Sequence, residues 1–130
     1  MTIDSRTKGS EGEREAAEYL SILFKLQVQR TRQFCGAPGV ADLRGLAGLH
    51  VEVKRCERLF IESALAQALR DAAATDVPVV LHRSNRCRWK FTFAADDLLR
   101  FLDAANALVD EGHRQAARNQ TDNSPPKEQT

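Results

Sequence analysis

Two short apolar runs, residues 40–43 and 49–53, flank a turn marked by glycines. This pattern predicts a β-hairpin or two adjacent strands. Side chains in a strand alternate between its two faces. In the second run this alternation puts the leucine and valines on one face and His50, Glu52 and Lys54 on the opposite face.

The first run carries a carboxylate among apolar neighbours. An unpaired carboxylate at Asp42 would be costly to bury. If the two runs pair, Asp42, Glu52 and Lys54 share one surface. Two carboxylates with an ammonium beside them can hold a divalent cation through oxygen ligands and keep a positive charge next to it.

Length and composition fit one globular domain, since the chain has 130 residues. Its three cysteines, Cys35, Cys56 and Cys87, are odd in number and widely spaced. They indicate neither a disulfide framework nor a zinc site, and they favour a reducing, cytoplasmic compartment. No apolar run approaches membrane-spanning length, so no membrane partner is expected.

The formal net charge is only +1, but the basic residues are unevenly distributed. They gather between Lys25 and Arg58 and again between His82 and Lys90. A basic surface of this kind would attract a phosphate backbone. Solvated arginines in strands and loops would give the same composition, so both interpretations stay open.

Hydrophobic periodicity predicts helices over residues 11–25, 57–74 and 96–111, and strands over 27–33, 40–43, 49–53, 77–81 and 88–93. The order is αβββαββα. A helix connects the strand runs 49–53 and 77–81. These two strands are therefore expected to be parallel neighbours. The expected fold class is α/β, with a mixed central sheet flanked by helices. Residues 1–9 are expected to form a flexible arm, and residues 112–130 a disordered tail.

Glu13 has two interpretations. Ser10-x-x-Glu13 is a capping-box pattern, in which the glutamate folds back on the Ser10 amide at the start of a helix. Glu13 also lies on the N-terminal extension of the apolar stripe of that helix, and a charge on the buried side needs a partner.

Several of these residues match motifs of a known protein family. Asp42, nine intervening residues and Glu52-x-Lys54 resemble the signature of the PD-(D/E)xK nucleases, which share a restriction-endonuclease-like core. The start of the first helix, Lys8-Gly9-x-x-Gly12-Glu13-Arg14-Glu15, resembles that of archaeal-type Holliday junction resolvases and related phage nucleases. The run GLHVEVKR at residues 48–55 is similar to the phage-type members, as are Gln67-Ala68, residues 78–83 and Trp89. The similarity covers roughly residues 6–102; Ala41 stands where the family often has proline, a position that is not a ligand.

The resemblance implies a nuclease domain over residues 10–111 that hydrolyses DNA phosphodiesters with Mg2+ or Mn2+. Asp42 and Glu52 would ligate the metal directly, the Val53 carbonyl would be a third ligand, and Glu13 would reach the metal from its helix. Lys54 would position or help activate the attacking water. Gln67 would support the site from the second helix, and His50 is expected to have a structural or DNA-near role.

The most specific function implied is that of a Holliday junction resolvase, which binds branched, four-way DNA and acts in recombination. Such an enzyme cuts two strands symmetrically, which implies a homodimer, here in the cytoplasm of a bacterium or of a phage host. The candidate phosphate contacts are Lys8, Arg14, Arg30, Arg32, Arg55, Arg83, Arg86 and Arg88. Three alternatives remain: a nicking, flap-type or restriction-like endonuclease of the same fold; a catalytically silent DNA-binding module; and a purely structural salt-bridge cluster on an unrelated α/β domain.

Overall fold

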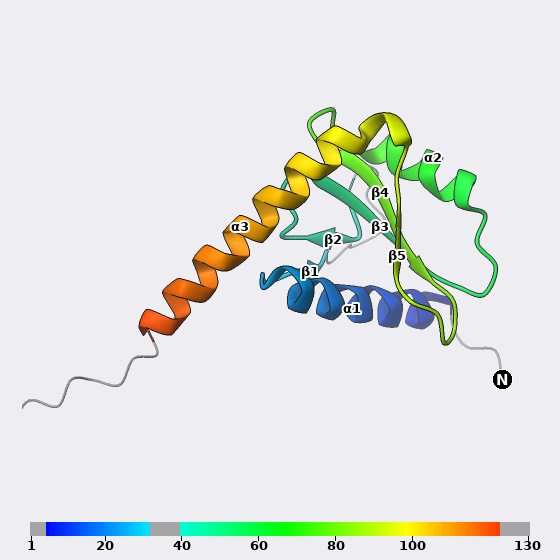
Figure 1. Cartoon of the computed structure of the whole chain (residues 1–130). Coiled ribbons are helices and arrows are strands. Elements are labelled where there is room, and N and C mark those ends of the chain that lie inside the picture. Colours follow the sequence, from blue (N-terminus) through cyan, green and yellow to red (C-terminus); the bar gives the residue numbers. More distant parts are fainter. Residues whose placement is uncertain (1–4, 32–39, 123–130) are drawn as a thin grey trace, which may run out of the picture.

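The computed structural model describes residues 5–31 and 40–122, which form a mixed α/β protein (Figure 1). In chain order the elements are α1 (Ser5–Phe24), β1 (Gln29–Arg30), β2 (Leu43–Arg44), β3 (Leu49–Arg55), α2 (Ile61–Asp71), β4 (Val77–Arg83), β5 (Lys90–Thr92), a 3-10 turn (Ala95–Asp97) and α3 (Leu98–Asp122). None of the helices in these two ranges is long and apolar enough to cross a membrane.

The central sheet has three strands in the order β3-β4-β5. β3 and β4 are parallel, with Leu49 opposite Val77 and Arg55 opposite Arg83, and β5 is antiparallel to β4. The expected mixed sheet and the parallel pair joined by a helical crossover are therefore confirmed. β1 and β2 form a separate antiparallel pair rather than part of a continuous sheet.

Helices cover both faces of the sheet, and the alternation of side chains decides which residues meet them. Leu49, Val51 and Val53 of β3 share a core with α1 and with Leu108 of α3. On the opposite face, Ala64 and Ala68 of α2 pack on Val80 of β4. His50, Glu52 and Lys54 therefore belong to the α2 side of β3, as the period of two predicts.

The first helix begins earlier than expected. Residues 5–9, predicted to lie in a flexible arm, belong to α1, while residues 1–4 lie outside the described ranges. Ser10 is consequently in the second turn of the helix, so the predicted capping box at Ser10 and Glu13 is wrong. The first half of α1 is held by tertiary contacts instead. A Cβ added at Gly12 would lie 2.9 Å from the Arg55 Cβ, so the helix and the end of β3 are in close contact.

The last helix also runs further than expected, because α3 continues to Asp122 through the predicted tail. The helix was expected to end at residue 111, but Gly112 is buried within α3, where a Cβ would meet the Phe24 carbonyl oxygen at 1.8 Å. The glycine thus allows α3 to lie against the end of α1. Beyond this contact α3 extends away from the sheet (Figure 1), and residues 123–130 lie outside the described ranges.

The apolar stripe predicted for the last helix is only partly buried. Leu108 is in the core, and Phe101 stacks on Phe93 with ring centroids 4.2 Å apart. Leu98, Leu102 and Val109 belong to the same predicted stripe but are 38–47% exposed, and neighbouring Leu99 is 74% exposed. One row of apolar side chains of α3 therefore packs on the core, and another faces outward.

Candidate active site

Three hydrogen bonds hold Asp42 in place, two of them to the free edge of β3. Its amide donates to the Val51 carbonyl oxygen (3.1 Å), and its own carbonyl accepts from the Thr31 amide (2.9 Å). The Val53 amide donates to the Asp42 Oδ2 atom (2.8 Å). The turn that permits this return of the chain contains Gly45 and Gly48, both at positive φ.

The Asp42 and Glu52 carboxyl groups meet at this edge. Burial, followed by the nearby charge of Glu52, raises the pKa of Asp42 to about 7. A side-chain hydrogen bond between the two groups and the charge of Glu13 act in the same direction, whereas the Val53 amide lowers the pKa. Two carboxylates this close resist being charged together, so Asp42 is partly protonated near neutral pH.

Glu52 is held from its other side by His50. The His50 Nε2 atom lies 2.9 Å from Glu52 Oε1, and both side chains are only 4% exposed. When Nε2 carries the proton, it donates to the carboxylate and fixes its orientation. His50 is thus a structural partner of Glu52, within the range of roles expected from the sequence.

Lys54 and Gln67 lie on the same side of the sheet as Glu52. The Lys54 Nζ atom donates to Gln67 Oε1 at 3.3 Å, so the amide of α2 restrains the ammonium. Lys54 is opposite His82 in the parallel register. His82 contacts the Thr92 hydroxyl (2.8 Å), and burial together with the charge of Lys90 lowers its pKa. The hydrogen bond with Lys54 is the observed contact of Gln67, and the supporting role of that glutamine stays a prediction.

Glu13 approaches the site but is engaged by an arginine. Its Oε2 atom accepts from Arg30 Nε at 2.9 Å, and its charge contributes to the raised pKa of Asp42. Glu13 is therefore near the carboxylate pair without contacting it directly in any described hydrogen bond. With the capping box excluded, ion pairing to Arg30 is its observed role.

The donors available to a cation are two carboxylates and the main chain. Across residues 5–31 and 40–122, no group of three His, Cys, Asp or Glu side chains is placed so that it could hold a metal ion. Val51 and Val53 both direct main-chain groups to Asp42, so the Val53 carbonyl oxygen lies on the same edge of β3. Mg2+ is commonly bound by one or two carboxylates, with waters and substrate phosphates completing its shell. The donor set fits such an ion and does not fit zinc.

The predicted phosphate-binding arginines fall into two groups. Arg30 pairs with Glu13, and both Arg55 and Arg83 pair with Glu15 of α1. Their charges are compensated within the protein, which sequence spacing does not reveal. Arg14, Arg86 and Arg88 are exposed, whereas Arg32 and the side chain of Lys8 lie outside the described residues.

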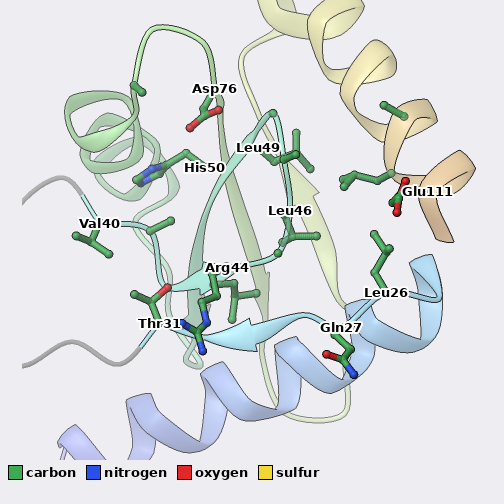
Figure 2. Close-up of a pocket in the computed structure, with 18 of the residues that line it drawn as sticks. Leu26, Gln27, Thr31, Val40, Arg44, Leu46, Leu49, His50, Asp76 and Glu111 are labelled. Atoms are coloured by element: carbon green, nitrogen blue, oxygen red, sulfur yellow. The ribbon is translucent and has the colours of Figure 1, made fainter. Parts of the chain in front are cut away.

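A wide groove of about 1020 Å³ borders this region but does not contain the carboxylate pair (Figure 2). It runs from α3 near Glu111, past Leu46 and Leu49, to His50 and Asp76. Neither Asp42 nor Glu52 lines it. His50, which contacts Glu52, lines the groove, as do Ala41 and Leu43 on either side of Asp42.

Comparison of the chain with protein-family models, curated proteins and solved structures gives no match. The chemistry of the site is therefore inferred from its residues. Asp42 and Glu52 form a buried acidic pair at a sheet edge, and Lys54 lies two residues along the same strand face. Such a pair binds either a proton or a cation, and the neighbouring ammonium favours an anionic ligand beside it.

Proposed function

We propose that the chain is a Mg2+-dependent endonuclease that hydrolyses DNA phosphodiesters, with a restriction-endonuclease-like core of the PD-(D/E)xK type. One observation carries the proposal: Asp42 and Glu52 are brought into contact at the edge of β3, with Lys54 on the Glu52 face. The order of elements, a helix, three strands, a helix, two strands and a helix, supports the same fold.

The raised pKa of Asp42 supports metal binding at this pair. Burial and the nearby charge of Glu52 raise the pKa of Asp42 to about 7, so the pair is partly protonated near neutral pH. A divalent cation would neutralise both carboxylates more completely than the proton does. Asp42, Glu52 and the Val53 carbonyl would hold it, and Mn2+ would serve as well as Mg2+.

Each residue then has a defined task. The Val53 amide orients the Asp42 carboxylate, and His50 orients that of Glu52. Lys54, restrained by Gln67, places its ammonium where it can hold the attacking water and offset charge on the phosphate in the transition state. When bound, Mg2+ supplies Lewis-acid polarisation of the phosphate. Glu13 supports the metal site through its charge.

We propose four-way DNA junctions as the substrate and a homodimer as the active form, both on the basis of the motif resemblance. Symmetric cutting of two strands requires two active sites related by a two-fold axis. The exposed row Leu98, Leu102 and Val109 on α3 offers an apolar surface for a second copy. The second candidate function is another endonuclease of this type, with nicking, flap or restriction-like activity, because none of the site residues selects a DNA shape.

Cleavage of labelled DNAs with Mg2+ tests the proposal. The panel contains a four-way junction, a flap, a nicked duplex and a linear duplex of matched sequence. Preferential cleavage of the junction supports a resolvase, whereas preference for another substrate supports the second candidate. DNA binding without cleavage of any member would indicate a catalytically silent module.

A further inference from the structure

A small hollow adjoins Lys54 near the N-terminal end of α2. It has a volume of about 200 Å³ and is lined by Lys54, Arg58, Leu59, Phe60, Ser63, Ala64 and Gln67. This is below the ~300–1,000 Å³ of pockets that enclose drug-sized ligands, so it suits a single base or phosphate group. Lys54 thus belongs both to the candidate active site and to this hollow.

The charge of the hollow is positive. Lys54 and Arg58 line it, and none of the described residues that line it is acidic. The two neighbouring glutamates point elsewhere: Glu57 accepts from the Asn85 amide, and Glu62 lines a different hollow with Leu69 and Pro78. The hollow therefore favours an anionic group.

Arg58 differs from the arginines that the structure places in ion pairs. Arg30, Arg55 and Arg83 are paired with glutamates of α1. Among the described residues, the exposed Arg58 guanidinium has no ion-pair or hydrogen-bond partner. An uncompensated guanidinium next to a site for phosphate chemistry is available for a second phosphate.

Phe60 adds an exposed apolar side chain to the hollow that Arg58 also lines. Its side chain is 80% exposed, the highest value among the large apolar residues that the structure describes. It lies at the N-cap position of α2, where no side chain caps the helix, and it lines the hollow with Ser63. An exposed aromatic ring beside cationic side chains is a common platform for a nucleic-acid base.

We infer that this hollow is a nucleotide subsite for the strand being cut, an inference that rests on the proposed function. Phe60 stacks on a base next to the scissile phosphate, and Arg58 and Ser63 contact the adjoining phosphate. Because stacking accepts any base, the subsite adds affinity and fixes the strand at Lys54 without reading sequence. The base must be unpaired or at a distorted position to reach Phe60.

The test measures binding of a fluorescein-labelled four-way junction and a labelled single strand in EDTA, which prevents cleavage. Phe60→Ala should weaken binding about 5- to 100-fold. Leu69→Ala, a truncation of another exposed apolar residue on α2 (66% exposed), should change it less than twofold. Melting temperatures of both variants confirm that the proteins remain folded.

Two further variants report on contact directly. Phe60→Trp should retain binding, and its added fluorescence should be quenched by DNA beyond the change seen for the parent, which contains only Trp89. Arg58→Gln should lower the slope of log K against log salt by about 1. Arg70→Gln, in the last turn of α2, should leave that slope unchanged.

Failure of the subsite is distinguishable from failure of the proposed function. If the parent cleaves DNA with Mg2+ but Phe60→Ala binds within twofold and Phe60→Trp is not quenched, the subsite is wrong and the nuclease proposal stands. If the parent neither binds nor cleaves any DNA of the panel, both are wrong.

Discussion

Asp42 and Glu52 form an acid pair at the free edge of β3, and burial together with the proximity of Glu52 raises the pKa of Asp42 to about 7. The Val53 amide and the His50 ring hold the two carboxyl groups in place. This arrangement resembles a cation site that binds a proton when no cation is present. Its consequences for stability and activity can be measured separately.

The first prediction concerns stability without metal. Because the Asp42 pKa is raised from 3.8 to about 7, the folded state binds more protons than the unfolded state between these values. Stability from this group is therefore present at low pH and is lost as the pH rises through about 7. Asp42→Asn, which mimics the protonated group, should gain up to about 3 kcal/mol relative to the parent between pH 5 and pH 8. Urea unfolding in EDTA measures this difference.

Asp103→Asn, an exposed position on α3, is the control for removal of one negative charge. Its effect should be the same at pH 5 and pH 8. An Asp42→Asn protein whose stability difference from the parent does not change with pH would show that the acid pair is not protonated.

The second prediction concerns Glu13, whose capping role is excluded by the position of Ser10 inside α1. Glu13→Gln removes a partly exposed ion pair with Arg30, so unfolding free energy should fall by no more than about 1 kcal/mol. If Glu13 supports the metal site, the Mg2+ concentration needed for half-maximal cleavage should rise at least severalfold. Arg30→Gln provides the comparison, since it breaks the same ion pair but keeps the carboxylate. Equal Mg2+ requirements for Glu13→Gln and the parent would restrict Glu13 to ion pairing.

The third prediction concerns the contact between α1 and α3. Gly112→Ala places a Cβ against the Phe24 carbonyl, so the helices must move apart, and we expect a loss of about 1–3 kcal/mol. Gly9→Ala is the matched control, because a Cβ at that position of α1 meets nothing within 4 Å. It should leave stability unchanged or raise it by up to about 1 kcal/mol. Thermal unfolding of both proteins measures the contrast, and an unchanged Gly112→Ala protein would argue against the close helix contact.

The fourth prediction concerns the exposed apolar row of α3. If it forms the dimer interface, Leu102→Glu should convert the dimer to a monomer in sedimentation experiments because it places a charge in the interface. Leu69→Glu alters an exposed leucine on α2 and should leave the dimer intact. A parent protein that is monomeric at all concentrations would rule out the homodimer.

Much of the site follows from local sequence patterns. The alternation of β3 puts Glu52 and Lys54 on one face, and the glycines between the two apolar runs return Asp42 to the edge of that strand. These features depend only on strand geometry and turn chemistry, so the sequence is sufficient to predict them. The crossover through α2 predicts the parallel pairing in the same way.

The errors arise where tertiary contacts override local signals. Ser10-x-x-Glu13 has the pattern of a helix start, yet α1 begins upstream at Ser5. Its contacts with the end of β3 come from the close approach of Gly12 and the ion pair of Glu15 with Arg55. A glycine often ends a helix, yet Gly112 lies within α3. The absence of a side chain there leaves room for the end of α1, where the Phe24 carbonyl lies close. A one-dimensional pattern carries no information on such neighbours.

The same limit applies to the arginines, because a sequence pattern does not show which of them form ion pairs. Arg30, Arg55 and Arg83 have carboxylate partners on α1 that are far away in sequence. Arg58 was not among the predicted contacts, although it has no such partner in the described part of the chain. A sequence signal next to Arg58 was the pair Leu59-Phe60, two apolar residues directly before a helix. In the structure Phe60 is exposed.

The most direct test of the central claim is Mg2+-dependent cleavage of a four-way junction by the parent and by Glu52→Gln, with binding of the same DNA measured in EDTA. We expect Mg2+-dependent cleavage by the parent, loss of cleavage by Glu52→Gln, and binding within a fewfold of the parent, because the amide keeps the side chain's shape but removes the charge that holds the cation. Asp42→Asn and Lys54→Ala should behave alike. Cleavage by Glu52→Gln at the rate of the parent would contradict the assignment of Asp42 and Glu52 as the metal-binding pair.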